Sequence, residues 1–240
     1  MSHNEIKELT FEESLLFRDS NVDGHRPMLG GIVVVRESGT RKILQPAKPN
    51  LVVRNGREMT LRKIFNLPGA VAGETESQLG AKSVLLFGIG TGGTPNNDPF
   101  NPFAVTPSDK DLSSAISFRT TSAAAPFSNS DAEKYTDGRA TTGGNIEWHK
   151  KLFSNGHGEI TVDPLTDTVY NKLSLQITSE DARDKFVNEL ALFWTRYNAA
   201  ALDMNSKFSD YFMFSRITFL TEPLPSSTSK GLDIDYFVYL

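Results

Sequence analysis

Three glycines, Gly88, Gly90 and Gly93, follow an apolar run with the G-x-G-x-x-G spacing of dinucleotide-binding proteins. In those proteins the last glycine opens a helix, and the free N–H groups of that helix bind the pyrophosphate. Here the segment after Gly93 contains Pro99 and Pro102. Proline disfavours helix at its own position and at the residue before it. We therefore expect a strand that leads into a glycine-rich loop, and no nucleotide site.

A second partial motif could concern a metal ion. Asp19, Asn21, Asp23 and Gly24 match the first half of an EF-hand calcium loop. The bidentate glutamate that completes such a loop would fall on Gly30, and a proline interrupts the second half. Without that carboxylate the coordination shell stays open, so we expect a polar turn and no metal site.

Motifs for catalysis are equally thin. The four histidines have no spacing that would place two of them on one helical face or in a hairpin ligand pair. Neither a G-x-S-x-G elbow nor a Walker lysine occurs. Asp109 and Asp111 lie close together, but charged pairs near a turn are ordinarily solvated. Sequence motifs do not test for an active site assembled from distant residues. On the motifs we expect a protein that is not an enzyme, with no catalytic residue and no cofactor.

Composition limits the classes of partner. The chain has 240 residues, 29 acidic and 25 basic, with a formal net charge of −4 and no long block of either sign. This balance gives no indication of direct nucleic-acid binding or of an anionic membrane surface. Apolar runs such as Ile32–Val35 are too short to span a bilayer, and we expect no signal peptide. Cysteine is absent, which is typical of a protein that matures in a reducing cytosol.

The elements that would position any site are mainly strands. Period-two alternation or β-branched runs bounded by turn residues predict strands. Residues 41–45 could be the hairpin partner of the strand expected at Gly30–Arg36, and Pro46–Asn50 would then break the ladder. One short helix is expected over Glu58–Phe65, after a strand end and turn at Arg54–Arg57. Residues 179–197 fit either a capped helix or a turn followed by a strand at Phe186–Phe193. The strands expected with less ambiguity are Gly30–Arg36, Leu51–Val53, Ser83–Ile89, Tyr170–Thr178, Phe212–Leu220 and Leu232–Leu240.

These patterns predict a mainly β protein. We expect an antiparallel sheet or sandwich with long Pro/Gly/Ser-rich loops and one or two short helices. Residues 1–50 are expected to form an N-terminal segment with a β-hairpin and an arm, and residues 51–240 the main β domain. Extended loops are predicted at residues 94–107 and 120–144, and a polar hairpin loop at residues 221–231.

Several segments resemble, in order along the chain, segments of virion proteins of large tailed bacteriophages. Phe87–Pro95 is similar to their F-x-v-G-T-G-G-x-P strand and loop, and Asn188–Phe193 to their i-N-E-l-g-L-F segment, with Ala191 where glycine is usual. The other matching segments are Ser108–Leu112, Val169–Arg183, Met213–Phe219 and Leu232–Leu240. The resemblance favours the strand interpretation of Phe186–Phe193.

The resemblance implies a non-enzymatic structural component of a contractile-tailed phage, in the tail, baseplate or neck. Its partners would be other virion proteins, in homo- or hetero-oligomers, and its location the virion, assembled in the host cytoplasm. Aromatic residues isolated in polar segments are candidate interface anchors, although each could also fold back on its own domain. The alternative is a host-surface or glycan-binding tail module, which would need exposed Trp and Tyr; of the two tryptophans we expect Trp194 to be buried. The interface candidates are Phe100, Phe103, Phe127 and Trp148.

Overall fold

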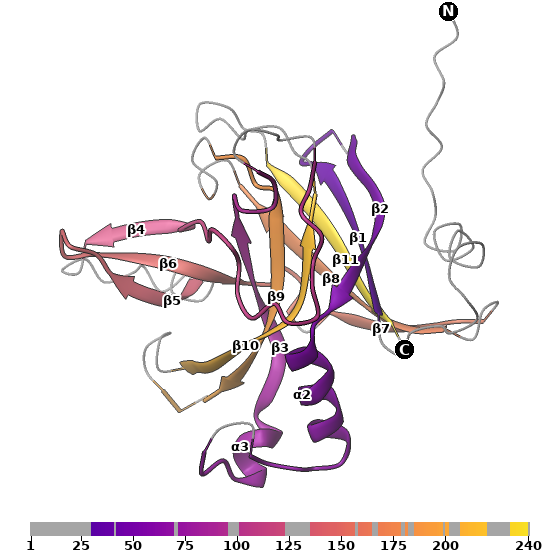
Figure 1. Ribbon diagram of the computed structural model, residues 1–240, viewed down its shortest axis with the longest axis vertical. Coiled ribbons are helices and arrows are strands. Elements are labelled where there is room, and N and C mark those ends of the chain that lie inside the picture. The colour runs from indigo at the N-terminus through magenta and orange to yellow at the C-terminus, as the bar shows by residue number, and fades with distance from the viewer. Residues whose placement is uncertain are drawn as a thin grey trace, which may run out of the picture.

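The computed structural model describes most of the chain from Gly30 onward (Figure 1). Residues 1–29, which contain the EF-hand-like segment and the part of the chain where an arm was predicted, lie outside the described residues. So do residues 123–134 and 221–230. The described residues are 30–40, 42–69, 72–95, 101–122, 135–156, 158–164, 168–178, 181, 185–198, 200–201, 207–219 and 231–239.

The protein is mainly β, as predicted. Its strands form one 11-stranded sheet in the order β4-β6-β3-β9-β10-β2-β1-β11-β8-β7, with β5 paired to the remaining side of β6. Every named pairing is antiparallel. The strands are β1 Gly30–Glu37, β2 Ile43–Val52, β3 Lys82–Gly90, β4 Arg119–Ser122, β5 Tyr135–Ala140, β6 Asn145–Leu152, β7 Glu159–Asp163, β8 Thr168–Ile177, β9 Glu189–Tyr197, β10 Phe208–Thr218 and β11 Leu232–Tyr239.

Strand β2 joins the two halves of the sheet. Its first part pairs with β1, and Leu51 and Val52 at its end pair with β10. The prediction that residues 46–50 break the ladder is wrong, because Lys48, Pro49 and Asn50 remain paired with β1. The register shifts on either side of Val35 place two extra residues in β2 relative to β1, and such irregularities accommodate proline, which has no N–H to donate.

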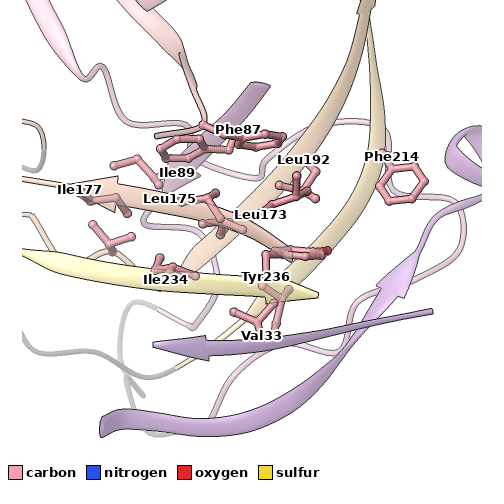
Figure 2. Packing of buried hydrophobic residues seen from close by; sticks show 14 of the residues in the cluster. Val33, Phe87, Ile89, Leu173, Leu175, Ile177, Leu192, Phe214, Ile234 and Tyr236 are labelled. Carbon is pink, nitrogen blue, oxygen red and sulfur yellow. The ribbon is translucent and has the colours of Figure 1, made fainter. Parts of the chain in front are cut away.

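The main core lies between the two halves of the sheet. Alternate residues of β8 and β11, including Leu175, Ile234 and Tyr236, face apolar residues of β3 and β9 such as Phe87 and Leu192 (Figure 2). This confirms the period-two interpretation of both strands. Each fully buried side chain of this size contributes about 1.5–3 kcal/mol relative to exposure, so the alternation fixes which face of each strand points inward.

A second, smaller cluster lies on the other face of β3, β9 and β10. It includes Ala191, Phe193 and Met213, with Leu112 from the segment after β3 packed against it. Strand β9 is therefore covered on both faces, which explains its nearly continuous burial. The strand interpretation is confirmed, although β9 begins at Glu189 instead of Phe186 and extends to Tyr197 instead of ending at Phe193.

The helices differ from the sequence prediction at their ends. Helix α2, Arg54–Ile64, begins four residues before the predicted helix, so the turn assigned to its first residues is wrong. Gly56 explains the difference: a Cβ there would lie 2.1 Å from the carbonyl oxygen of Phe214. The glycine that resembled a turn residue instead allows α2 to approach β10 closely. Helix α3, Glu76–Gly80, was not predicted; Thr75 and Gln78 form a capping box at its start.

Two predicted loops also need correction. The segment 120–144 is not an uninterrupted loop, because β4 extends into it and β5 begins at Tyr135, both pairing with β6. Strands β10 and β11 do not form a hairpin: β10 pairs with β9 and β2, and β11 with β1 and β8. In the predicted loop at 94–107, the described residues contain neither helix nor strand.

None of the helices in the described part of the chain has the length and apolar character needed to cross a membrane.

Candidate functional site

The glycines of the opening motif lie against the start of β9. A Cβ on Gly90 would come within 2.3 Å of Oε1 of Glu189, and one on Gly93 within 2.0 Å of the carbonyl oxygen of Asn188. Gly92 is similarly close to Glu189. Neither contact requires a left-handed backbone, so what these positions need is the absence of a side chain. The glycines make room for a buried carboxylate, in agreement with the expectation of a glycine loop without a helix.

The carboxylate of Glu189 is fully buried and surrounded by donors. Its Oε1 accepts hydrogen bonds from the backbone N–H groups of Gly92, at 3.0 Å, and Ser114, at 2.9 Å. Its Oε2 accepts one from the N–H of Ser113, at 3.1 Å. Arg216 donates to the same Oε2 through Nε, at 3.1 Å, and Nη2, at 2.5 Å. The charge is thereby balanced by a guanidinium, and both oxygens are engaged.

Arg216 extends the network to the segment between β3 and β4. Its Nη1 donates to Oδ2 of Asp109 at 2.8 Å, and its Nη2 donates to Oγ of Ser113 at 2.7 Å. Thr106 in turn donates to Asp109 through its hydroxyl, at 2.6 Å. A single guanidinium thus connects β10, β9 and the segment 101–118.

Asn188 binds the start of the segment between β3 and β4. Its Oδ1 accepts from the N–H of Gly93 at 2.7 Å, and its Nδ2 donates to the hydroxyl of Thr94 at 2.8 Å. The N–H of Phe103 donates to the carbonyl of Gly93, and the carbonyl of Phe103 accepts from the hydroxyl of Thr218. We call the side chains of Asp109, Asn188, Glu189 and Arg216 with the N–H groups of residues 92, 93, 113 and 114 the Glu189 network.

The pKa shifts within the network follow from its contacts. Burial acts to raise the pKa of Asp109, but hydrogen bonds from Thr106 and Arg216 outweigh it, so the pKa lies below its ordinary value. Burial acts to lower the pKa of Arg216, and the hydrogen bonds to Asp109 and Glu189 outweigh that effect and raise it. Both groups are therefore held in their charged forms. A carboxylate whose oxygens already accept several hydrogen bonds is suited to holding a loop in place.

Other buried charges are also paired. Lys151 donates to Asp181 at 2.6 Å and to the carbonyl of Gln176 at 3.0 Å, and Tyr135 donates to the second oxygen of Asp181 at 2.7 Å. Lys150 binds Asp137 at 2.8 Å. These contacts connect β5 and β6 to the end of β8. Within the residues that the structure covers, no group of three or more His, Asp or Glu side chains is arranged to hold a metal ion.

The structure places the predicted interface residues in different environments. Phe103 is 49% exposed, on a backbone held by hydrogen bonds to Gly93 and Thr218, and stays available as an anchor. Trp148 in β6 is only 5% exposed, so its ring belongs to the protein's own interior. Trp194 is buried, as expected. Phe100 and Phe127 lie outside the described residues.

Sequence reasoning missed the role of three charged residues. Asp109 was assigned to a solvated turn, but it binds Arg216. Glu189 and Arg216 were noted only within segments of the resemblance. Glu189 directly precedes the apolar run Leu190–Trp194, and Arg216 lies between Phe214 and Ile217; a charge next to buried apolar residues needs a partner. That pattern was the available signal.

No family model matches the chain. Searches of the curated proteins and of the solved structures likewise found no match.

Proposed function

We propose that this protein is a non-enzymatic structural component of a contractile-tailed phage virion, in the tail, baseplate or neck, acting through assembly interfaces. One observation supports this most. Four segments of the resemblance to virion proteins, far apart in sequence, contribute to the Glu189 network: residues 87–95, 108–112, 188–193 and 213–219. A shared set of short motifs has a physical reason to recur together when its members complete one another's hydrogen bonds.

The exposed surface also supports an assembly role. Large apolar side chains that are substantially exposed gather in two places among the described residues. One is the end of α2 and the turn after it, where Leu61, Ile64, Phe65 and Leu67 are each at least 56% exposed. The other is the β7–β8 hairpin. Contiguous exposed apolar groups are typical of surfaces that bind other proteins.

Purified particles of the phage whose genome encodes this chain provide the test. Mass spectrometry of gradient-purified tails and complete particles should find the chain at a fixed ratio to a known tail protein. Its absence from both would overturn the proposal. The glycan-binding alternative would be favoured instead by binding of the isolated protein to a glycan array.

A matched pair of phage variants sharpens the test. Glu189→Ala removes the buried carboxylate, and Glu58→Gln changes a carboxyl that is 53% exposed. We expect particles lacking the chain, or arrested assembly, only with Glu189→Ala. Normal assembly with a chain that is shown to be unfolded would contradict a structural role.

A further inference from the structure

Strand β7 ends the sheet and carries unusual residues for an edge. It pairs with β8 alone among the described strands. Natural edge strands avoid further pairing through lysine, proline, bulges or very short length. β7 has five residues, Glu159–Asp163, in uninterrupted register with β8 and without lysine or proline. Ile160 and Val162 within it are 74% and 57% exposed.

The exposed side chains of the hairpin share one face. Val162 lies opposite Val169, and side chains two residues apart point the same way, so Ile160, Val162 and Val169 form one apolar surface. Val169 is in phase with Leu173 and Leu175, which face the main core. The core-facing side of the sheet therefore continues outward along the hairpin. No described side chain buries it there, because all three residues are at least 38% exposed.

A second edge strand lies at the opposite end of the sheet that the described residues form. β4, Arg119–Ser122, pairs with β6 alone among the described strands. β4 and β7 lie on opposite sides of the molecule, each on an arm that projects from the body (Figure 1). β5 is less suited to further pairing because Asp137 has a left-handed backbone, φ 60°, and binds Lys150.

Charge selects the pairing between these edges. β7 has a carboxylate residue at each end, Glu159 and Asp163, whereas Arg119 is the only charged residue of β4. Antiparallel pairing of β7 with a second β7 would place Glu159 opposite Asp163, and like charges directly opposite are destabilising. Antiparallel pairing of β7 with β4 can place Arg119 opposite Asp163, with Thr121 opposite Thr161.

We propose that β7 of one copy of this protein adds to the β4 edge of a second copy, head to tail, in that register. The two sheets become continuous, and Val162 and Ile160 then lie opposite Thr120 and Ser122 of the second copy. Because the two surfaces differ, the contact repeats and produces a ring if the rotation closes, or a filament if it does not. The inference rests on the proposed function, since it names the assembly interface.

Disulfide trapping tests the register. The chain contains no cysteine, so introduced thiols are the only ones present. Directly opposed residues of an antiparallel pair have Cα atoms about 4.5–5.5 Å apart, which suits a disulfide. A tagged Thr161→Cys protein is mixed with untagged Thr121→Cys and oxidised. We expect a disulfide-linked heterodimer, and none above background when Leu61→Cys, 56% exposed on α2, replaces Thr121→Cys.

Two results would overturn the proposal. One is the absence of the heterodimer, and the other is equal linkage of Thr161→Cys to itself, which would indicate β7–β7 pairing. Sedimentation provides a second measurement: Val162→Lys should weaken self-association about tenfold or more, and Val162→Thr, which keeps a β-branched side chain, far less. Equal association of both variants would also contradict it.

The same trapping in purified particles separates this inference from the proposed function. Particles that contain the chain but show no link between positions 121 and 161 would refute the interface and leave the virion role standing. Absence of the chain from particles, with the link formed in solution, would refute the virion role and leave self-association standing.

Discussion

The Glu189 network and the β7–β8 hairpin invert the usual distribution of polar and apolar groups. At the network, the Glu189 carboxylate and the Arg216 guanidinium are buried against each other and against the segment 101–118. At the hairpin, isoleucine and valine project into solvent. The buried charges are completed by the protein's own backbone, whereas the apolar face of the hairpin has no cover from the described residues. The hydrogen bonds of the first region are therefore completed within one chain, and in our proposal a second copy of the protein completes the second region.

The contrast also separates stability from assembly. Breaking the network leaves buried hydrogen-bond donors without an acceptor, which lowers the free energy of unfolding whether or not a partner is present. Substitutions in the β7–β8 hairpin alter side chains that are already exposed to water, so they should change the free energy of unfolding of the monomer little. Substitutions in the two regions should thus affect different measurements.

Glu189→Ala tests the network with the largest expected effect. Removing the carboxylate leaves the Arg216 guanidinium and three backbone N–H groups without their acceptor, and breaking such a buried pair costs about 3–5 kcal/mol. Urea denaturation measures the change. Glu58→Gln disrupts the exposed pair with Arg62 and should cost at most about 1 kcal/mol. Similar losses for both variants would remove the distinction between the two regions.

Gly93→Ala tests the close approach of the glycine loop. The new methyl group would lie 2.0 Å from the carbonyl oxygen of Asn188, and relief of such overpacking costs about 1–3 kcal/mol. Gly80→Ala is the matched control, because a Cβ in that helix meets no atom within 4 Å. The control should be neutral or stabilising by up to about 1 kcal/mol. Thermal unfolding of the two variants should therefore shift in opposite directions, and a neutral Gly93→Ala would show that the loop is not tightly seated.

Asp109→Asn tests the outer part of the network through pH. The pKa of Asp109 is below its ordinary value of 3.8, so its ionised form stabilises the fold at neutral pH. That contribution is present above pH 3.8 and is lost as the pH falls through the lower pKa of the folded state. We expect Asp109→Asn to cost about 1–2 kcal/mol at neutral pH. Denaturation at several pH values should show the gap to the unsubstituted protein narrowing below pH 3.8; a constant gap would contradict this account.

The strands were predictable where their side chains alternate locally. β8 and β11 alternate apolar and polar residues, and the alternation alone gives their inward faces. β4 and β5 were missed because their residues are mostly polar or small and show no apolar alternation. Their backbone hydrogen bonds to β6 make them strands. The start of α2 was missed because Gly56 indicates a turn until the carbonyl of Phe214, far along the chain, is placed beside it.

The site was predictable only in its parts. The glycines and the charges at Glu189 and Arg216 are visible in the sequence, but each has an ordinary interpretation alone. Arg216 contacts Glu189, 27 residues away, and Asp109, 107 residues away. Such separations place these contacts beyond any local pattern: the antiparallel register of β9 with β10 brings Glu189 and Arg216 together, and the segment after β3 brings Asp109 to them.

The same isoleucine-to-valine substitution in the main core and on the β7–β8 hairpin compares the two environments directly. The expected changes in unfolding free energy are the smallest of these predictions. Ile177→Val removes a methylene group from a side chain that is fully buried in the main core, and it should cost about 0.5–1.5 kcal/mol. Ile160→Val makes the same change on β7 at 74% exposure and should leave the unfolding free energy within about 0.5 kcal/mol. Both are measured by urea denaturation at low protein concentration, where chains do not associate. A loss at Ile160 equal to that at Ile177 would mean that the monomer itself covers the hairpin, and the hairpin would then no longer be a surface left for a partner.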